Sequence, residues 1–327
     1  MDEFELIDRF FSRPPRSASV VLGVGDDAAL LAPTAGHEIV VSVDMLVEGR
    51  HFFAGADPEK LGHKTLAVNL SDLAAMGATP RWALLAGALP KSDRAWLAAF
   101  ARGFYAEAER HGVDLVGGDT TRGPLNLCVT ILGEVPAGKA LTRAGAAPDD
   151  DVYVSGRLGD AALAVAATTG RVMLPDDVLA ACRARLDTPV PRTALGLALR
   201  GVASAAIDVS DGLTGDLGHI LERSAVGAVV DLASIPRSPP VAAMLAGPER
   251  ALALGCLLAG GDDYELCFTA PPAAAPRIRA MAADVELPLT RIGSITAGRG
   301  LVVRDERGAP LPVLPRAFDH FGLDNDG

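Results

Sequence analysis

The sequence contains no long uninterrupted run of apolar residues. Hydrophobic residues make up 49% of the chain, but glycine, proline or charged residues interrupt them well short of the roughly 18 residues that a membrane-spanning helix needs. The N-terminal stretch MDEFELIDRFF is acidic and lacks the basic-then-apolar order of a signal peptide. We therefore expect a cytoplasmic protein that does not act at a membrane.

Cysteines and basic residues are also few. The 4 cysteines lie far apart and form no CxxC pair, so neither a zinc knuckle nor a disulfide framework is indicated. The 30 basic residues against 41 acidic ones leave a net charge of −11, and no basic cluster offsets it, so we expect no nucleic-acid partner. Such a surface also repels nucleotides, unless the acidic residues hold cations.

The 327 residues are enough for two domains, because domains cluster at roughly 100–150 residues. The segment Pro136–Asp151 is rich in glycine, alanine, proline and aspartate. It predicts a boundary between domains of residues 1–138 and 139–327. Before the boundary, the pattern predicts strands Ser19–Leu22, Glu38–Val43, Trp82–Leu89, Asp114–Val116 and Leu125–Val135, with helices Pro58–Met76 and Asp93–His111 between them.

The second half repeats this alternation of strands and helices. Such alternation indicates α and β layers packed together on a sheet. The predicted strands are Val152–Ser155, Ala205–Val209, Tyr264–Thr269 and Arg291–Ile295, and the predicted helices follow Gly159 and cover Thr193–Arg200 and Leu213–Arg223.

Two glycine-rich motifs resemble nucleotide-binding loops but lack parts that those loops need. Gly23–Ala28 fits the dinucleotide fingerprint GxGxxA, but Pro33 follows too soon for the crossover helix of that fold. Gly133–Ala140 resembles a Walker A loop, but its last residue has no hydroxyl for magnesium and Pro136 has no amide for phosphate. We reject the first motif and interpret the second as a solvated turn.

Aspartates recur where the predicted strands end. A helix cap or a turn accounts for any one of them, but not for acids at the ends of so many strands. An aspartate inside a helix, such as Asp72, is mildly unfavourable and needs a reason. The set comprises Asp26, Asp27, Asp44, Asp72, Asp119, Asp208, Asp211, Asp262 and Asp263.

These aspartates predict a magnesium site. Oxygen ligands without histidine or cysteine favour magnesium over zinc, and magnesium is commonly shared with substrate phosphates. In phosphoryl transfer, metal ions bridge two anions that repel each other and neutralise the charge that develops. A protein with a net charge of −11 can therefore bind ATP together with a phosphorylated acceptor.

Seven segments make the chain similar to the thiamine-monophosphate kinase family, and the resemblance as a whole runs from about Phe4 to Phe321. This resemblance implies a two-domain α+β or α/β chain with the aminoimidazole ribonucleotide synthetase-like fold. In that fold, an N-terminal mixed sheet with helices forms a β-barrel across a dimer, and the C-terminal domain is an α/β sandwich. The segments are GVGDDAAL (Gly23–Leu30), Ser42–Phe52, Lys64–Pro80, Leu115–Pro124, Ala140–Ala146, Ala205–Ile220 and Gly260–Thr269.

The resemblance also implies an activity. The γ-phosphoryl group of ATP would pass directly to the phosphate of thiamine monophosphate and give thiamine diphosphate, with several Mg²⁺ ions and no enzyme nucleophile. The first domain would bind metal and ATP and form a homodimer, and the second would complete the nucleotide and substrate site.

The family's functional residues are carried over position by position. Val43 stands where relatives often have Thr, so a metal contact there would use its carbonyl, and Asp262 stands where the longer Glu is usual. We expect Asp44, Asp119 and Asp211 to carry catalysis. The implied magnesium ligands are Asp27, Ser42, Val43, Asp44, Asp72, Asp119, Asp208 and Asp211; the ATP contacts are Gly118, Asp119, Arg143 and Ser210; the substrate contacts are His51, Asp262 and Phe318.

Two alternatives remain open. The first is another ATP-using enzyme of the same superfamily. Selenophosphate synthetase is expected to carry a reactive Cys or Sec and a Lys near its N-terminus, the carbamoyl dehydratase a C-terminal Cys, and aminoimidazole ribonucleotide synthetase lacks the VEGRHF pattern that is present here. The second is a noncatalytic ATP or metal sensor, which would not consume ATP when a phosphorylated acceptor is added.

Overall fold

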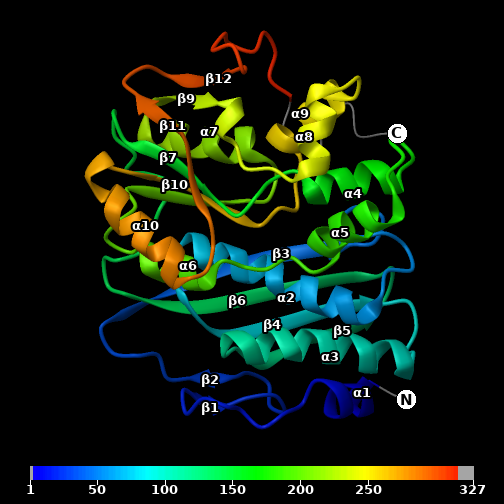
Figure 1. Cartoon of the computed structure of the whole chain (residues 1–327). Helices are drawn as coiled ribbons and strands as arrows, with labels where there is room; N and C mark the ends of the chain where they lie inside the picture. The colour runs from blue at the N-terminus through cyan, green and yellow to red at the C-terminus, as the bar shows by residue number, and fades with distance from the viewer. Residues whose placement is uncertain (1–2, 316–327) are drawn as a thin grey trace. The chain divides into compact units, whose positions relative to one another are not determined.

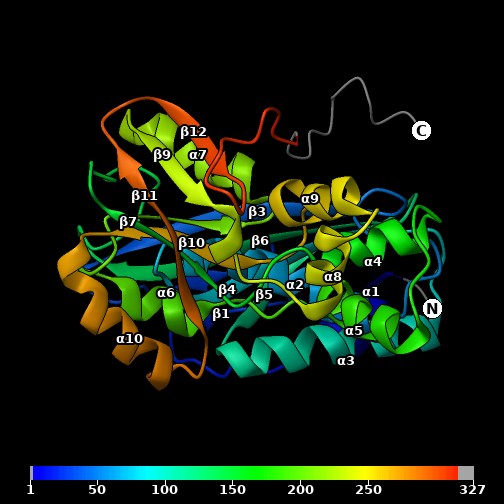
Figure 2. The same ribbon diagram turned by 45° about the horizontal axis from the view of Figure 1, so that its top comes forward.

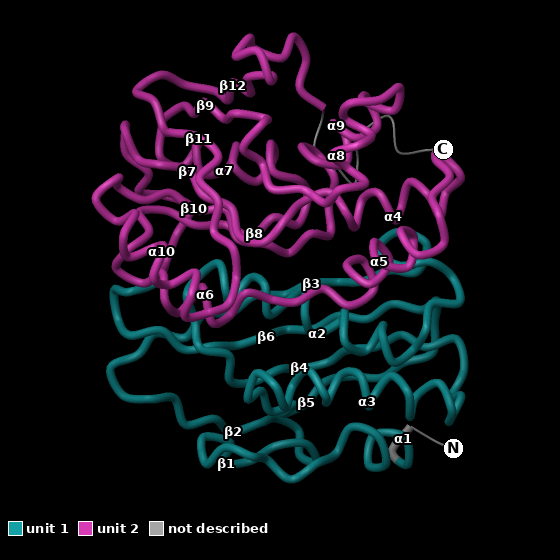
Figure 3. Tube along the Cα trace, viewed as in Figure 1, with its two compact units in different colours: residues 1–140 teal, residues 141–327 magenta. Residues whose placement is uncertain are grey.

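The computed structural model describes residues 3–315. The chain divides into two compact units, Met1–Ala140 and Leu141–Gly327, coloured separately in Figure 3. The composition of the sequence had placed this boundary after residue 138. Each unit has its own sheet and is described by itself.

Unit 1 contains a four-stranded mixed sheet in the order β3-β6-β4-β5. β3 pairs with β6 and β6 with β4 in antiparallel directions, whereas β4 and β5 are parallel. A parallel pair needs a crossover connection, and α3 supplies it. The elements are β3 (His37–Val47), α2 (Pro58–Ala75), β4 (Thr79–Leu89), α3 (Arg94–His111), β5 (Asp114–Arg122) and β6 (Asn126–Pro136).

The two long helices of unit 1 pack side by side against the sheet (Figure 1). Each begins at an aspartate whose side chain accepts two backbone amides, Asp57 for α2 and Asp93 for α3. Glycines let the helix backbones approach closely. A Cβ at Gly62 would lie 2.1 Å from the Phe100 carbonyl oxygen, and one at Gly103 would lie 1.8 Å from that of Glu59.

Neither glycine-rich motif forms the dinucleotide-binding or Walker A loop that it resembles. The first lies in the turn between β1 (Val20–Leu22) and β2 (Leu30–Leu31), and no helix separates these strands. The second begins at the end of β6 and continues as turn and coil up to β7, again without a helix. Both rejections are therefore confirmed. The remaining element of unit 1 is α1 (Glu3–Phe10).

Unit 2 contains a six-stranded sheet in the order β12-β9-β11-β7-β10-β8. Every pair is antiparallel except β12 with β9. Every residue of β7, β8 and β10 is buried, which marks the core of the unit. The strands are β7 (Asp151–Ser155), β8 (Ala205–Val209), β9 (Gly227–Asp231), β10 (Glu265–Ala270), β11 (Leu289–Thr296) and β12 (Gly300–Arg304).

Helices complete unit 2. α4, α5, α8 and α9 gather at one end of the unit in both Figure 1 and Figure 2, and α7 packs against β8 and β12. The α/β fold class predicted from the sequence is confirmed. The helices are α4 (Asp160–Thr168), α5 (Asp176–Asp187), α6 (Thr193–Leu199), α7 (Leu213–Ser224), α8 (Pro239–Ala246), α9 (Arg250–Ala259) and α10 (Ala275–Asp284), with short 3₁₀ turns at Leu232–Ser234 and Pro272–Ala274.

Two predicted strand ends were wrong, and both affect the site. β3 pairs with β6 without interruption as far as Val47, so Asp44 lies inside a strand rather than at its end. β5 pairs with β4 as far as Arg122, so Asp119 also lies inside a strand. The length of each strand depends on how far it pairs with its neighbour in the sheet, and residue propensities along the sequence do not show that pairing.

Within residues 3–315, no helix is long and apolar enough to span a membrane.

Candidate functional site

Three of the predicted ligands in unit 1 lie where β3 packs against α2. The Ser42 hydroxyl donates a hydrogen bond to Oδ2 of Asp72. The Asp44 amide donates to Oδ1 of Asn69 at 3.1 Å, and the Asn69 amide group donates in turn to the Thr65 carbonyl at 3.0 Å. Asn69 and Asp72 are three residues apart, so they share one face of α2. This contact explains why an aspartate stands inside the helix.

The side chain of Val43 belongs to the opposite face of β3. It is 58% exposed, and it lies in an alternating apolar row with Ile39, Val41 and Met45, which are 40–58% exposed. Successive side chains of a strand point to opposite faces, so Ser42 and Asp44 share the α2 side while Val43 does not. Only the carbonyl of Val43 has the chemistry of a metal ligand.

Gly118 and Asp119 occupy the middle of β5. At Gly118 (φ 153°) a Cβ would lie 1.9 Å from the Leu85 carbonyl oxygen, so only glycine fits this close approach of β5 to β4. Asp119 and Asp27 are both exposed, and both line one cavity of unit 1. The fold thus brings together two predicted ligands that are distant in the sequence.

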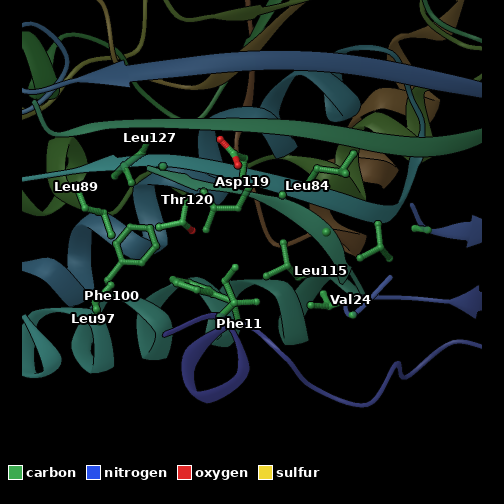
Figure 4. A pocket seen from close by; sticks show the side chains of 18 of the residues that line it. Phe11, Val24, Leu84, Leu89, Leu97, Phe100, Leu115, Asp119, Thr120 and Leu127 are labelled. Atoms are coloured by element: carbon green, nitrogen blue, oxygen red, sulfur yellow. The ribbon is translucent and has the colours of Figure 1, made fainter. Parts of the chain in front are cut away.

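That cavity has a volume of about 520 Å³ and a mostly apolar lining. Trp96 and Phe100 of α3 stack in its wall with ring centroids 5.2 Å apart. In Figure 4 the Asp119 carboxylate points away from the Phe11 and Phe100 rings, and Thr120, the next residue of β5, lies nearer to them. The cavity therefore has an aromatic interior and a polar edge that carries Gly118 and Asp119.

His51 follows β3 and is oriented by the backbone of that strand. The Val47 amide donates a hydrogen bond to Nδ1 of His51 at 3.0 Å. Because Nδ1 is the acceptor, the proton of the neutral ring lies on Nε2. The sequence favoured no role for this histidine apart from the family resemblance, and the structure fixes which nitrogen can donate to a ligand.

In unit 2, Asp208 is buried in β8, and Ser210 and Asp211 follow in the turn before α7. Asp216 organises this turn. Its Oδ2 accepts the amides of Ser210, Asp211 and Gly212, each at 3.1 Å. Burial, followed by the charge of Asp211, raises the pKa of Asp216 to about 7. We did not predict this residue, although an acid in the first turn of a predicted helix is a signal for such a cap.

The remaining predicted residues of unit 2 lie in two places. The Asp262 amide donates to the Ser210 carbonyl at 2.9 Å, so the fold brings these two together. Arg143 lies on the exposed segment before β7, where its carbonyl oxygen accepts the Ser224 hydroxyl at 3.2 Å. Phe318 lies outside the described residues.

No three His, Cys, Asp or Glu side chains within residues 3–315 form a metal site by themselves. The predicted ligands are instead small sets of oxygen atoms, such as the Ser42 hydroxyl beside the Asp72 carboxylate. Magnesium is commonly held by one or two carboxylates together with waters and substrate phosphates. The donor chemistry therefore fits magnesium bound with a phosphorylated ligand.

Comparison with protein families defines the class. The model of the AIR synthase related protein, N-terminal domain, matches residues 25–135, and that of the C-terminal domain matches residues 148–306. The two matches fall on separate units of the structure.

Comparison with individual proteins is more specific. The chain is 44% identical to the thiamine-monophosphate kinase of Salmonella typhimurium over 98% of each chain. It is similar to the crystal structure of thiamine-monophosphate kinase from Stenotrophomonas maltophilia (47% identity, 95% of this chain and 98% of that one, TM-score 0.86). It is also similar to AaThiL complexed with AMPPCP and TMP (27% identity, 89% of each chain, TM-score 0.76). The chain belongs to the AIR synthase related family and, within it, to the thiamine-monophosphate kinases.

Proposed function

We propose that the protein transfers the γ-phosphoryl group of ATP to thiamine monophosphate and forms thiamine diphosphate. The observation that carries this function is the identity of 44% with a thiamine-monophosphate kinase over 98% of each chain. AaThiL, which has a similar fold, is complexed with AMPPCP and TMP. The oxygen donors and the apolar cavity described above suit a nucleotide and a phosphorylated acceptor.

We propose that several Mg²⁺ ions take part. When bound, they would neutralise the charge of the two phosphorylated substrates. The Ser42–Asp72 contact supports this assignment, because it leaves a hydroxyl and a carboxylate together beside Asp44. The proposed ligands in unit 1 are Asp27, Ser42, the Val43 carbonyl, Asp44, Asp72 and Asp119, and those in unit 2 are Asp208 and Asp211.

We propose that the base of ATP binds in the cavity of unit 1. Its aromatic wall of Trp96 and Phe100 suits a flat base. Gly118 and Asp119 at its polar edge are proposed ATP contacts, and the volume of about 520 Å³ is ample for a base and sugar. Arg143 and Ser210 are the proposed ATP contacts of unit 2.

A side chain added inside this cavity should weaken ATP binding. A Cβ at Gly87 would meet only Leu127, at 3.8 Å, so Gly87→Leu fits locally and extends into the cavity. We expect KM for ATP to rise about tenfold, with KM for thiamine monophosphate within about twofold. Gly255→Leu in α9, where an added Cβ has no neighbour within 4 Å, is the control. An unchanged KM for ATP would show that the base binds elsewhere.

We propose that His51 and Asp262 hold the acceptor, together with Phe318. The Nε2 proton of His51, fixed by the hydrogen bond at Nδ1, can donate to a substrate phosphate. Neither residue acts as a nucleophile, because the acceptor phosphate itself attacks the γ-phosphorus of ATP. The chain then has to bind and align the two substrates and exclude water.

We propose that the protein is a cytoplasmic homodimer. β3 is an edge strand of 11 residues, and its apolar row of Ile39, Val41, Val43 and Met45 is 40–58% exposed. Long edge strands with exposed apolar side chains are usually covered by a partner. A second copy of this sheet would cover the row, as the family's β-barrel across the dimer requires.

The acceptor is the simplest test of the proposed function. We expect turnover of magnesium-ATP with thiamine monophosphate and none with free thiamine, because a metal-rich site has little use for a neutral hydroxyl acceptor. The measurement is steady-state ATP consumption with thiamine, thiamine monophosphate and formylglycinamidine ribonucleotide. Equal turnover of thiamine and its monophosphate would contradict the proposal, and binding of ATP without turnover would indicate a sensor.

A further inference from the structure

The loop Gly260–Tyr264 connects α9 to β10, and we call it the substrate loop because it carries Asp262. Its backbone is strained on both sides of Asp263. Asp262 has φ 68° and Tyr264 has φ 49°, in the left-handed region that residues other than glycine rarely adopt. Such strain persists only where the surrounding contacts hold it. Contacts must therefore hold this loop in place.

Two backbone hydrogen bonds fix one side of the substrate loop. The Asp262 amide donates to the Ser210 carbonyl at 2.9 Å, and the Tyr264 amide donates to the Val209 carbonyl at 2.8 Å. Gly261 permits this approach, since a Cβ there would lie 2.6 Å from the Ser210 carbonyl oxygen. The loop thus lies directly against Ser210–Gly212, which we call the nucleotide loop.

The side chain of Asp263 fixes the other side. It is 4% exposed, and its two oxygens lie 2.9 and 3.1 Å from the amide of Gly159 at the start of α4. Burial raises the pKa of Asp263 well above its ordinary value, and within residues 3–315 no ion pair involves this side chain. Asp263 therefore serves in the fold as a hydrogen-bond acceptor for the Gly159 amide.

The nucleotide loop has a separate anchor. Asp216 accepts all three of its amides, so its conformation does not depend on Asp263. Loss of the Asp263 contact should therefore displace Asp262 and leave Ser210 where it is. A change at Asp263 should therefore affect the binding of thiamine monophosphate and leave the binding of ATP unaffected.

We propose that Asp263 is a positioning residue that holds Asp262 in place for the phosphorylated acceptor. The inference rests on the proposed function, because Asp262 is a proposed substrate contact. It adds a residue that does not itself touch substrate. Its role is to accept the Gly159 amide and so keep the strained loop closed.

The test compares Asp263→Ala, Asp263→Asn and a control of equal burial, Asp150→Ala. Asp150 is 5% exposed and accepts the Ala147 amide at 3.0 Å, away from the substrate loop. We expect Asp263→Ala to raise KM for thiamine monophosphate about tenfold and to leave KM for ATP within about twofold. Asp263→Asn keeps an acceptor and should resemble the parent. Asp150→Ala should lower Tm with both KM values unchanged.

A double-mutant cycle shows whether Asp263 acts through Asp262. In the Asp262→Asn background, where Asn tolerates a positive φ, Asp263→Ala should add little to KM for thiamine monophosphate, because coupled residues are not additive. Additive effects, an unchanged KM in Asp263→Ala, or an Asp263→Asn variant as poor as Asp263→Ala would each overturn the inference. If the alanine variant does not fold, Asp263→Ser replaces it.

Hydrogen–deuterium exchange separates this inference from the proposed function. In the ligand-free protein, Asp263→Ala should speed exchange in the peptide that covers residues 260–265, while peptides around residue 150 keep the parent's rate. Uniformly faster exchange would indicate a general loss of stability and would overturn the inference. If the parent protein fails to phosphorylate thiamine monophosphate, the proposed function fails, and the exchange result still decides whether Asp263 holds the loop.

Discussion

Asp119→Asn should reduce turnover by about 10²-fold or more while Tm stays unchanged or rises. A metal site supplies several kcal/mol of transition-state stabilisation, and each 1.36 kcal/mol is a factor of ten in rate. The Asp119 side chain is exposed and caps no helix, so folding should not need it. Removing one of several neighbouring negative charges relieves repulsion with acids such as Asp27.

The control for this variant is Asp8→Asn, which removes another exposed acid of unit 1 outside the proposed site. It should keep full turnover. Raising the magnesium concentration should partly restore Asp119→Asn, because the variant weakens metal binding rather than the fold. An Asp119→Asn protein that unfolds, or one that keeps full turnover, would show that Asp119 is not a metal ligand.

Glu107→Gln should produce the opposite result, a large loss of stability with turnover per folded molecule intact. The Glu107 side chain is fully buried, with Arg110 Nη1 at 2.5 Å, His111 Nε2 at 3.0 Å and His63 Nδ1 at 3.2 Å. Removing one partner of a buried ion pair costs about 3–5 kcal/mol. We expect the lower end, about 3 kcal/mol, because the Arg110 side chain is 59% exposed.

Thermal unfolding measures this effect as a decrease in Tm of about 10 °C. Glu109→Gln on the same helix is the control, because Glu109 is 54% exposed and surface ion pairs contribute little.

The effect of Glu107→Gln should also depend on pH. Burial alone would raise the pKa of Glu107, but the contacts with His111 and His63 outweigh it and hold that pKa at about 2. The stabilisation is then complete above pH 4.5, the unperturbed pKa. It decreases as the pH falls towards 2, so the difference in Tm should shrink below pH 4.5.

These two acids show where the sequence is informative. The sequence favoured Asp119 because it follows a glycine pair near a predicted strand, and it favoured Asp72 because an acid inside a helix needs a reason. Ser42, which contacts Asp72, came only from the family resemblance. Two partners of Glu107, Arg110 and His111, lie three and four residues along the same helix, but the sequence does not show that His63 of another helix also contacts it or that the group is buried. Roles that depend on contacts between distant segments become visible only in the folded chain.

Some helices were predicted from the sequence and others were missed. The two long helices of unit 1, α2 and α3, were predicted within a residue, α2 from the spacing of its leucines and from Gly77 just past its end. The helices that were missed are α1, α5, α8, α9 and α10. A missing side-chain cap does not account for α8 and α9, because α4, α6 and α7 were predicted and also lack one. Asp216 was also missed, although its place in the first turn of the predicted helix α7 is a signal for a cap; its three amide partners lie in the turn after β8. Helix and strand propensities describe single residues and do not show which groups will be hydrogen-bonded in the folded chain.

Transfer of a labelled phosphoryl group tests the central claim most directly. The protein is incubated with magnesium, thiamine monophosphate and ATP labelled with ¹⁸O in the γ-phosphate, and the products are resolved by ³¹P NMR and mass spectrometry. We predict that the label appears in the terminal phosphate of thiamine diphosphate, with one ADP formed for each product molecule. ATP consumption that releases labelled inorganic phosphate and forms no thiamine diphosphate would contradict the account.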